Sequence, residues 1–97
     1  MAKLSDTDIE SRLQMLTGWE RVDVGGKPGI RKVYKTGNFL NGLGFITRVA
    51  VLAEKADHHP DVIFTYPRVT MQLTTHDAGG LTEKDFDWAA KIEAIQM

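Results

Sequence analysis

The sequence predicts an α+β fold in which helices cover one face of a four-stranded antiparallel sheet, in the order α-β-β-α-β-β-α. Three observations predict it. Two pairs of strand-length segments are each joined by a short turn, apolar residues recur at helical spacing in three other segments, and the helical and strand segments alternate along the chain. With 97 residues, 42% of them hydrophobic, we expect one domain spanning residues 1–97.

The first helix is predicted within residues 5–18, "SDTDIESRLQMLTG". Ser5 can cap the free amides at its start, with Asp8 three residues later, and Gly18 ends the pattern. The apolar side chains between them recur three or four residues apart: Ile9, Leu13 and Leu16. This spacing is typical of a short helix with one buried face.

Four strands are predicted in two pairs. The first pair is "WERVDV" and "IRKVYK" around "GGKPG", whose glycines permit positive φ and whose proline cannot continue a ladder, so we expect a hairpin with this segment as its turn. The second pair is "VIFTY" and "VTMQLTT" around Pro67 and Arg68. In the last of these strands one face carries Val69, Met71, Leu73 and Thr75.

The main helix is predicted from Phe39 to about Asp57. Its apolar side chains fall three or four residues apart: Phe39, Leu43, Ile46, Val49, Ala50 and Ala53. Pro60 cannot extend the helix and disfavours the αR conformation at His59. The two neighbouring histidines therefore lie at or just beyond the C-terminal end of this helix.

A last helix is predicted within "LTEKDFDWAAKIEAI", residues 81–95. Thr82 and Asp85 stand at capping-box spacing, which is typical of a helix start. The apolar residues that follow form one stripe: Trp88, Ile92 and Ile95. We expect this stripe to be buried against the sheet.

Charge and sheet size limit the expected partners. The chain has 12 basic and 13 acidic side chains and a net charge of -1, so no strong field is expected to attract nucleic acid or a membrane surface. The exposed edges of so small a sheet invite pairing with a second copy. We therefore expect a homodimer or homotetramer.

The sequence contains no cysteine, so disulfides and thiolate chemistry are excluded and a reducing compartment is allowed. The N-terminal "MAKLSDTDIE" has no apolar segment of a signal peptide. The longest apolar stretch, "FITRVAVLA", is interrupted by Arg48 and is too short to span a bilayer. We expect a cytoplasmic protein.

The three histidines are all predicted at the ends of elements, where site residues are usually presented. His58 and His59 stand where the main helix stops, and His76 stands where the last strand stops. Glu54 is four residues before His58, and Asp57 is adjacent to it, so a carboxylate can orient an imidazole. Imidazoles, with a pKa near about 6.5, can give and take protons at neutral pH.

Other interpretations of these residues stay open. A histidine after a helix can simply contact its last carbonyls. Three imidazoles could bind zinc, but adjacent histidines usually diverge and no His-x-x-x-His pair is present, so we expect no metal. Ser5 and Ser11, the only serines, lack the strained turn of a nucleophile. Trp19 could pack in the core or form the wall of a pocket for a flat heterocycle.

Two segments, "AEKADHHPD" (53–61) and "TTHDAGGLTEKDFDWAAKIE" (74–93), resemble the pterin-4a-carbinolamine dehydratase family. The doubled histidine with its proline, the Thr-His-Asp element, the paired glycines and the following Leu-Thr occur in the family's order. The central helix "FLNGLGFITRVAVLAEK" is similar as well, and Trp19 falls where the family has a tryptophan. The similarity runs from about Phe39 to Ile95.

The resemblance implies a dehydratase domain over residues 1–97 that eliminates water from 4a-hydroxytetrahydrobiopterin. The product is a quinonoid dihydropterin, which is reduced to recycle tetrahydrobiopterin after an aromatic amino acid hydroxylase has turned over. The reaction needs one proton delivered to the departing hydroxyl and another removed from a ring nitrogen, without metal or further cofactor.

The resemblance also implies roles for individual residues. His58 and His76 would exchange protons with the substrate, and His59 would bind and orient it. The implied substrate-binding residues are Trp19, Glu54, Asp57, Pro60, Thr74, Thr75 and Asp77. Glu54 and Asp57 would in addition tune the imidazoles.

Two further functions remain as alternatives. Animal members of the family also act as dimerisation cofactors that bind a homeodomain transcription factor. That function would require an exposed apolar helix face and would not depend on the histidines. A small oligomeric scaffold would use its histidines only to cap and cross-link. The enzyme alone predicts that turnover depends on the histidines.

Overall fold

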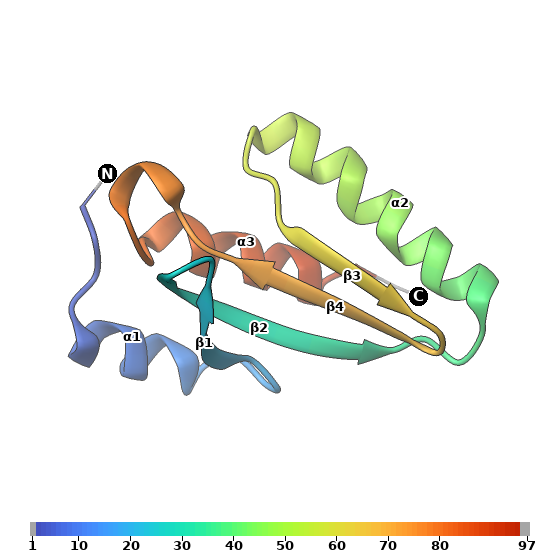
Figure 1. Ribbon diagram of the computed structural model, residues 1–97, viewed down its shortest axis with the longest axis horizontal. Coiled ribbons are helices and arrows are strands. Elements are labelled where there is room, and N and C mark those ends of the chain that lie inside the picture. Colours follow the sequence, from blue (N-terminus) through green and yellow to red (C-terminus); the bar gives the residue numbers. More distant parts are fainter. Residues whose placement is uncertain (1, 96–97) are drawn as a thin grey trace.

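The four strands form one antiparallel sheet in the order β1-β2-β4-β3 (Figure 1). In the computed structural model, which describes residues 2–95, the strands are β1 (Glu20–Val24), β2 (Lys27–Lys35), β3 (Asp61–Thr65) and β4 (Arg68–Leu73). The helices are α1 (Asp6–Leu13), α2 (Phe39–Ala56) and α3 (Glu83–Glu93), with a 3-10 turn η1 (His76–Ala78). The predicted fold class and element order are confirmed.

One hydrophobic core lies between the helices and a single face of the sheet. Strand residues that pair directly across the ladder point to the same face, and Ile30 pairs with Leu73 while Tyr34 pairs with Val69. All four are buried. Each helix adds buried side chains to this same cluster, among them Ile9, Phe45, Val49, Phe86, Trp88 and Ile92.

The first hairpin is confirmed, but its turn is shorter than predicted. Gly25 and Gly26 alone form the turn, with φ of 59° and 86°, and the rest of "GGKPG" belongs to β2. Pro28 lies opposite Asp23, next to the pair that closes the turn. In a two-residue antiparallel hairpin this next pair exchanges no hydrogen bonds, so the absent N–H of the proline removes nothing from the ladder.

Helix α2 begins where predicted, with Asn38 accepting a hydrogen bond from the amide of Asn41 at 2.8 Å. Its buried face matches only part of the predicted stripe. Val49 and Ala53 are buried as predicted, and Phe45 is buried as well, whereas Phe39 and Leu43 are 58% and 49% exposed. The reason is Gly42, which brings the helix so close to Phe64 of β3 that this face packs on the sheet.

Candidate functional site

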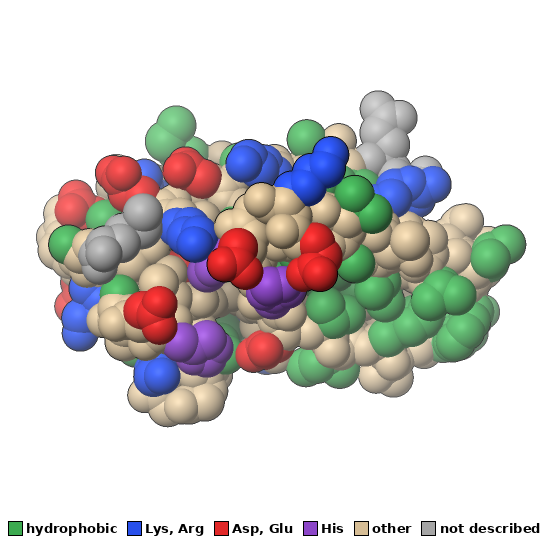
Figure 2. Space-filling model, turned by 90° about the horizontal axis from the view of Figure 1, so that it is seen from above, with side chains coloured by type: hydrophobic (Ala, Val, Ile, Leu, Met, Phe, Trp, Pro, Cys, Tyr) green, Lys and Arg blue, Asp and Glu red, His purple; other side chains and the backbone are tan. Residues whose placement is uncertain are grey.

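The three histidines lie around one cavity of about 370 Å³. It is lined by residues 57–61, which follow α2 and begin β3, by residues 74–77, which follow β4, and by Lys84 of α3. Because β3 and β4 are antiparallel neighbours, the start of one strand lies beside the end of the other, and Asp61 pairs with Gln72. This topology brings His59 close to His76. Figure 2 shows the histidines on one face of the molecule, with acidic side chains around them.

The end of α2 sends its two histidines in different directions. Asp57 has a left-handed backbone with φ of 50°, and the amide of His58 donates to the carbonyl of Ala53 at 3.3 Å. The chain reverses sharply at this cap. His58 then turns inward and is 9% exposed, whereas His59 is exposed.

His58 is held by Asp85, a carboxylate that sequence reasoning did not assign to the site. His58 Nε2 lies 2.8 Å from Asp85 Oδ1, and Asp85 is fully buried. A carboxylate that accepts here fixes the proton on Nε2 and leaves the lone pair on Nδ1. Asp85 was expected only as a capping residue, and it keeps that role, since its Oδ2 accepts from the amide of Thr82 at 3.0 Å.

Two threonines complete the surroundings of Asp85. The hydroxyl of Thr75 donates to Asp85 Oδ2 at 2.8 Å. Since that proton is used, Thr82 donates its own hydroxyl to Thr75 Oγ1 at 2.9 Å. Asp85 thus accepts from the imidazole, a hydroxyl and an amide, which satisfies a buried carboxylate and locks the ring of His58.

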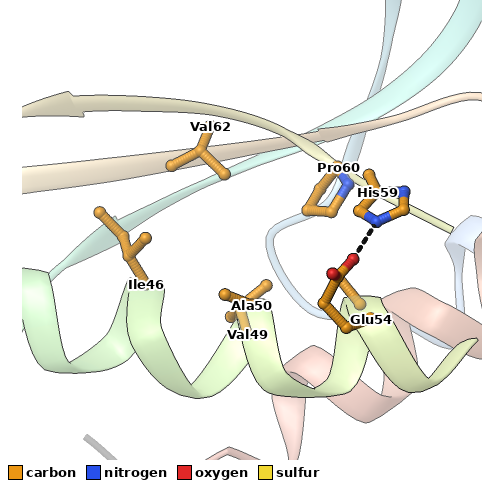
Figure 3. Close-up of a pocket in the computed structure, with 8 residues that line it drawn as sticks. Ile46, Val49, Ala50, Glu54, His59, Pro60 and Val62 are labelled. Carbon is orange, nitrogen blue, oxygen red and sulfur yellow. Dashed lines mark hydrogen bonds and ion pairs between the residues drawn. The ribbon is translucent and has the colours of Figure 1, made fainter. Parts of the chain in front are cut away.

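Glu54 orients His59 and not His58, so the expectation that it would act across one helical turn on His58 is wrong. Glu54 Oε2 lies 2.6 Å from His59 Nε2, and both side chains are more than half exposed (Figure 3). The pair stands at one end of an apolar groove between α2 and β3, lined by Ile46, Val49, Ala50, Ala53, Pro60 and Val62. The groove has a volume of about 380 Å³.

The other predicted residues are divided between the cavity and the scaffold. Asp57, Pro60 and Asp77 line the cavity, and so does His76, the first residue of η1. Thr74 lines it as well, but its hydroxyl donates to the carbonyl of Pro28 at 2.7 Å. The side chain of Thr74 is thereby committed to holding the end of β4.

Trp19 lies in the core and does not line the histidine cavity. Its indole N–H donates to Glu93 Oε1 at 3.0 Å, and its ring packs edge-on against Tyr34. Of the two interpretations of Trp19, the structure therefore shows the packing one. In the sequence, a single large aromatic residue at the start of a strand fits either interpretation. The structure decides between them, because Trp19 precedes β1, which forms the opposite edge of the sheet from β3.

Glu93 is the centre of a second polar cluster, away from the histidines. Its Oε1 accepts from Trp19, from Lys32 Nζ at 2.6 Å and from the hydroxyl of Tyr34 at 2.6 Å. Burial alone would raise the pKa of Glu93, but these three donors outweigh it and lower that pKa. Burial and the neighbouring carboxylate raise the pKa of Tyr34. The cluster ties α3 to β2 and to the start of β1.

Residues 2–95 show neither a metal-binding cluster nor a helix that could span a membrane. No group of three or more histidine, aspartate or glutamate side chains is placed to hold a metal ion. Within the same part of the chain, none of the helices combines the length and the apolar composition needed to span a bilayer.

Comparisons with known proteins agree with the geometry. The family model described as pterin 4 alpha carbinolamine dehydratase matches residues 2–95. A protein of Roseiflexus sp. (strain RS-1) that carries the family's name is 50% identical over 93 residues, which is 96% of either chain. Another, from Acidobacterium capsulatum, is 46% identical and covers 98% of this chain and 99% of its own.

A solved structure is similar as well. The crystal structure of a transcriptional coactivator/pterin dehydratase from Brucella melitensis is 37% identical, with a TM-score of 0.87, and the match covers 95% of this chain and 96% of that one. Fold and sequence therefore agree over nearly the whole length. The chain belongs to the pterin-4a-carbinolamine dehydratase family.

Proposed function

We propose that this protein eliminates water from 4a-hydroxytetrahydrobiopterin by histidine acid-base catalysis, with the pterin as substrate and no further cofactor. The observation that carries the proposal is the convergence of His58, His59 and His76 on one cavity, which bears several hydrogen-bonding groups. Membership of the family supports the same reaction. The C4a–O bond breaks, the hydroxyl leaves as water with a proton from a general acid, and a general base removes a ring N–H proton as the C=N bond forms.

His58 is the residue best prepared to act as the base. Asp85 holds its Nε2–H, so the lone pair of Nδ1 is the group that can receive a proton. The buried carboxylate stabilises the imidazolium that results, as positioned carboxylates do for other catalytic histidines. Asp85 touches no cavity surface and acts through His58, so it is a positioning residue.

His76 and His59 take the complementary roles. His76 is exposed at the rim and is the general acid, because an exposed imidazole regains a proton from water after each turnover. His59 is held by Glu54 and orients the pterin ring. Asp57 and Asp77 accept N–H groups of the pterin, whereas Thr74, Thr75 and Pro60 shape the wall that the ring contacts. Trp19 has no role in this proposal.

The experiment replaces the two proton-transferring histidines. We expect His58→Ala and His76→Ala to slow dehydration of the 4a-hydroxypterin by about two to four orders of magnitude, the usual contribution of a positioned acid or base. Stopped-flow absorbance measures the rate, and circular dichroism checks the fold. Full activity in the double variant would remove the proposal.

The setting of the reaction is proposed from its chemistry. The product is an oxidised dihydropterin that a reductase must return to the tetrahydro form, after an aromatic amino acid hydroxylase has produced the substrate. We propose the cytoplasm as the compartment of these steps, because a chain without cysteine is suited to a reducing compartment.

Self-association is a second proposal, favoured by a specific surface. Helix α2 exposes several large apolar side chains, namely Phe39, Leu40, Leu43 and Val51, which are 49–76% exposed. Strand β3 forms one edge of the sheet, where unpaired amides are free to join another strand. Both features support a homodimer or homotetramer.

A further inference from the structure

The wall of the histidine cavity carries an excess of negative charge. Three aspartates line it, Asp57, Asp61 and Asp77, and we refer to them as the acidic rim. Lys84 is the one cationic side chain among the lining residues. None of the three aspartates takes part in an ion pair within residues 2–95. When the imidazoles are neutral, the lining has an excess of two negative charges.

The acidic rim comes from the two chain segments that line the cavity, residues 57–61 and 74–77. Asp57 caps α2, Asp61 begins β3, and Asp77 lies in η1. All three side chains are exposed. Lys84 instead lies on α3 and borders a neighbouring hollow together with His58. The one cation therefore lies on a different element from the three carboxylates.

A bound pterin needs only part of this negative charge. The pyrimidine edge of a pterin presents the N–H donors of its amino group and ring amide, which Asp57 and Asp77 accept in the proposed function. Asp61 is then the one lining carboxylate that is left for the substituent at C6 of the ring. An anionic substituent would meet like charge in a concave site, where the protein walls strengthen the field.

We propose that the acidic rim makes the site selective for pterins whose C6 substituent is uncharged, and that Asp61 is a specificity-determining residue. This rests on the proposed function, because it assumes that the ligand is a pterin. Phosphorylated or carboxylated pterins bind more weakly because of charge repulsion and not because of their size. The repulsion is between exposed charges, so dissolved salt weakens it.

Two stable fluorescent pterins of similar size test the proposal: 6-hydroxymethylpterin, which is neutral, and pterin-6-carboxylate. Fluorescence titration gives the dissociation constant of each. We expect the wild-type protein to bind 6-hydroxymethylpterin about tenfold more tightly than pterin-6-carboxylate at low ionic strength. This ratio of the two dissociation constants should decrease at about 0.5 M salt. Asp61→Lys should decrease the same ratio by about tenfold.

The matched control is Asp23→Lys, the same charge change on β1 at the opposite edge of the sheet. Asp23→Lys should leave the ratio of the two dissociation constants unchanged. Equal affinities in the wild-type protein, or a ratio that Asp61→Lys does not alter, would overturn the proposal. A dehydration assay with a 6-methyl substrate separates the two ideas: turnover without charge discrimination overturns the selectivity alone, and discrimination without turnover overturns the dehydratase function alone.

Discussion

Three residues of one type have three different surroundings around the same cavity. His58 is buried against Asp85, His59 is exposed and paired with Glu54, and His76 lies at the start of η1. These surroundings set which nitrogen carries a proton and how easily water reaches it. Acid, base and orienting roles can therefore be separated among chemically identical side chains.

The role of Asp85 can be tested apart from its capping role. Asp85→Asn keeps the shape of the side chain but removes the charge and one acceptor oxygen, so His58 loses its fixed tautomer. We expect kcat to fall by about tenfold or more with KM nearly unchanged, since Asp85 touches no substrate. Steady-state kinetics measure both constants.

Asp87→Asn is the control for Asp85→Asn. It lies on the same helix, is exposed, and borders a different hollow, so it should keep wild-type kinetics. If the Asp85 variant raised KM and left kcat intact, Asp85 would not act through the base.

At the scale of the elements, α2 is positioned by its contact with β3. A Cβ built on Gly42 would lie 2.6 Å from a ring carbon of Phe64 and 3.0 Å from Thr36 Oγ1. Phe64 also stacks on Phe39, at 4.7 Å between ring centres, so its ring has two contacts with α2. Since His58 and His59 follow the last turn of α2, this contact helps to set where they lie.

Two glycines of α2 give a matched test of that contact. Alanine favours a helix over glycine by about 1 kcal/mol, and Gly44 has room for it, with its nearest contact, Arg48, at an ordinary 3.4 Å. We expect Gly44→Ala to stabilise the protein by up to about 1 kcal/mol. Gly42→Ala should destabilise it by about 1–3 kcal/mol, because overpacking exceeds the propensity gain.

Urea denaturation followed by circular dichroism measures both free energies of unfolding. Equal stabilisation by the two substitutions would show that α2 and β3 are not held at close approach.

At the scale of the whole molecule, Glu93 joins elements that are far apart in the sequence. It accepts from Trp19, Lys32 and Tyr34, and it is the last residue of α3. Lys32 also donates to the carbonyl of Thr17 at 2.8 Å, which adds the loop after α1. The sheet, α3 and the N-terminal loop are thus linked at one carboxylate.

This link predicts how stability depends on pH. Because its pKa is lowered on folding, Glu93 binds fewer protons in the folded chain than in the unfolded chain. Its contribution is full above the unfolded pKa, about 4.3, and is lost as the pH falls through the lower folded value. Glu93→Gln should reduce the free energy of unfolding at pH 7 by about 1–2 kcal/mol.

The difference between Glu93→Gln and the wild-type protein should shrink on acidification, as measured by urea denaturation at a series of pH values. Glu10→Gln, an exposed position on α1, serves as the control and should show no difference at any pH. A Glu93→Gln difference that stays constant down to the acid range would contradict the lowered pKa.

Assembly is a second property of the whole molecule. If α2 forms the interface, Leu43→Glu places a charge in it and should produce a smaller species, because burying an unpaired charge is strongly unfavourable. Light scattering after size exclusion measures the mass. Met15→Glu, equally apolar but outside α2, should leave the assembly unchanged. A wild-type protein that is already monomeric would refute self-association.

The sequence by itself determined the elements, because their signals are local. Ser5, the Thr82–Asp85 pair and the alternation from Val69 to Leu73 depend on neighbours a few residues away, and all of them were confirmed. The turn at Gly25 and Gly26 is shorter than the predicted one. The sequence alone does not show whether the missing N–H of a proline falls at a position that needs a hydrogen bond in the sheet or at one that does not.

Only the tertiary structure decided which side chains meet. His58 with Asp85 and Trp19 with Glu93 are separated by 27 and 74 residues, and no local pattern selects one distant partner over another. The buried face of α2 was likewise decided by Phe64 of β3, on which Gly42 packs. The spacing of residues along the chain determines which helix or strand each residue joins. Packing against the sheet determines which distant residue it contacts.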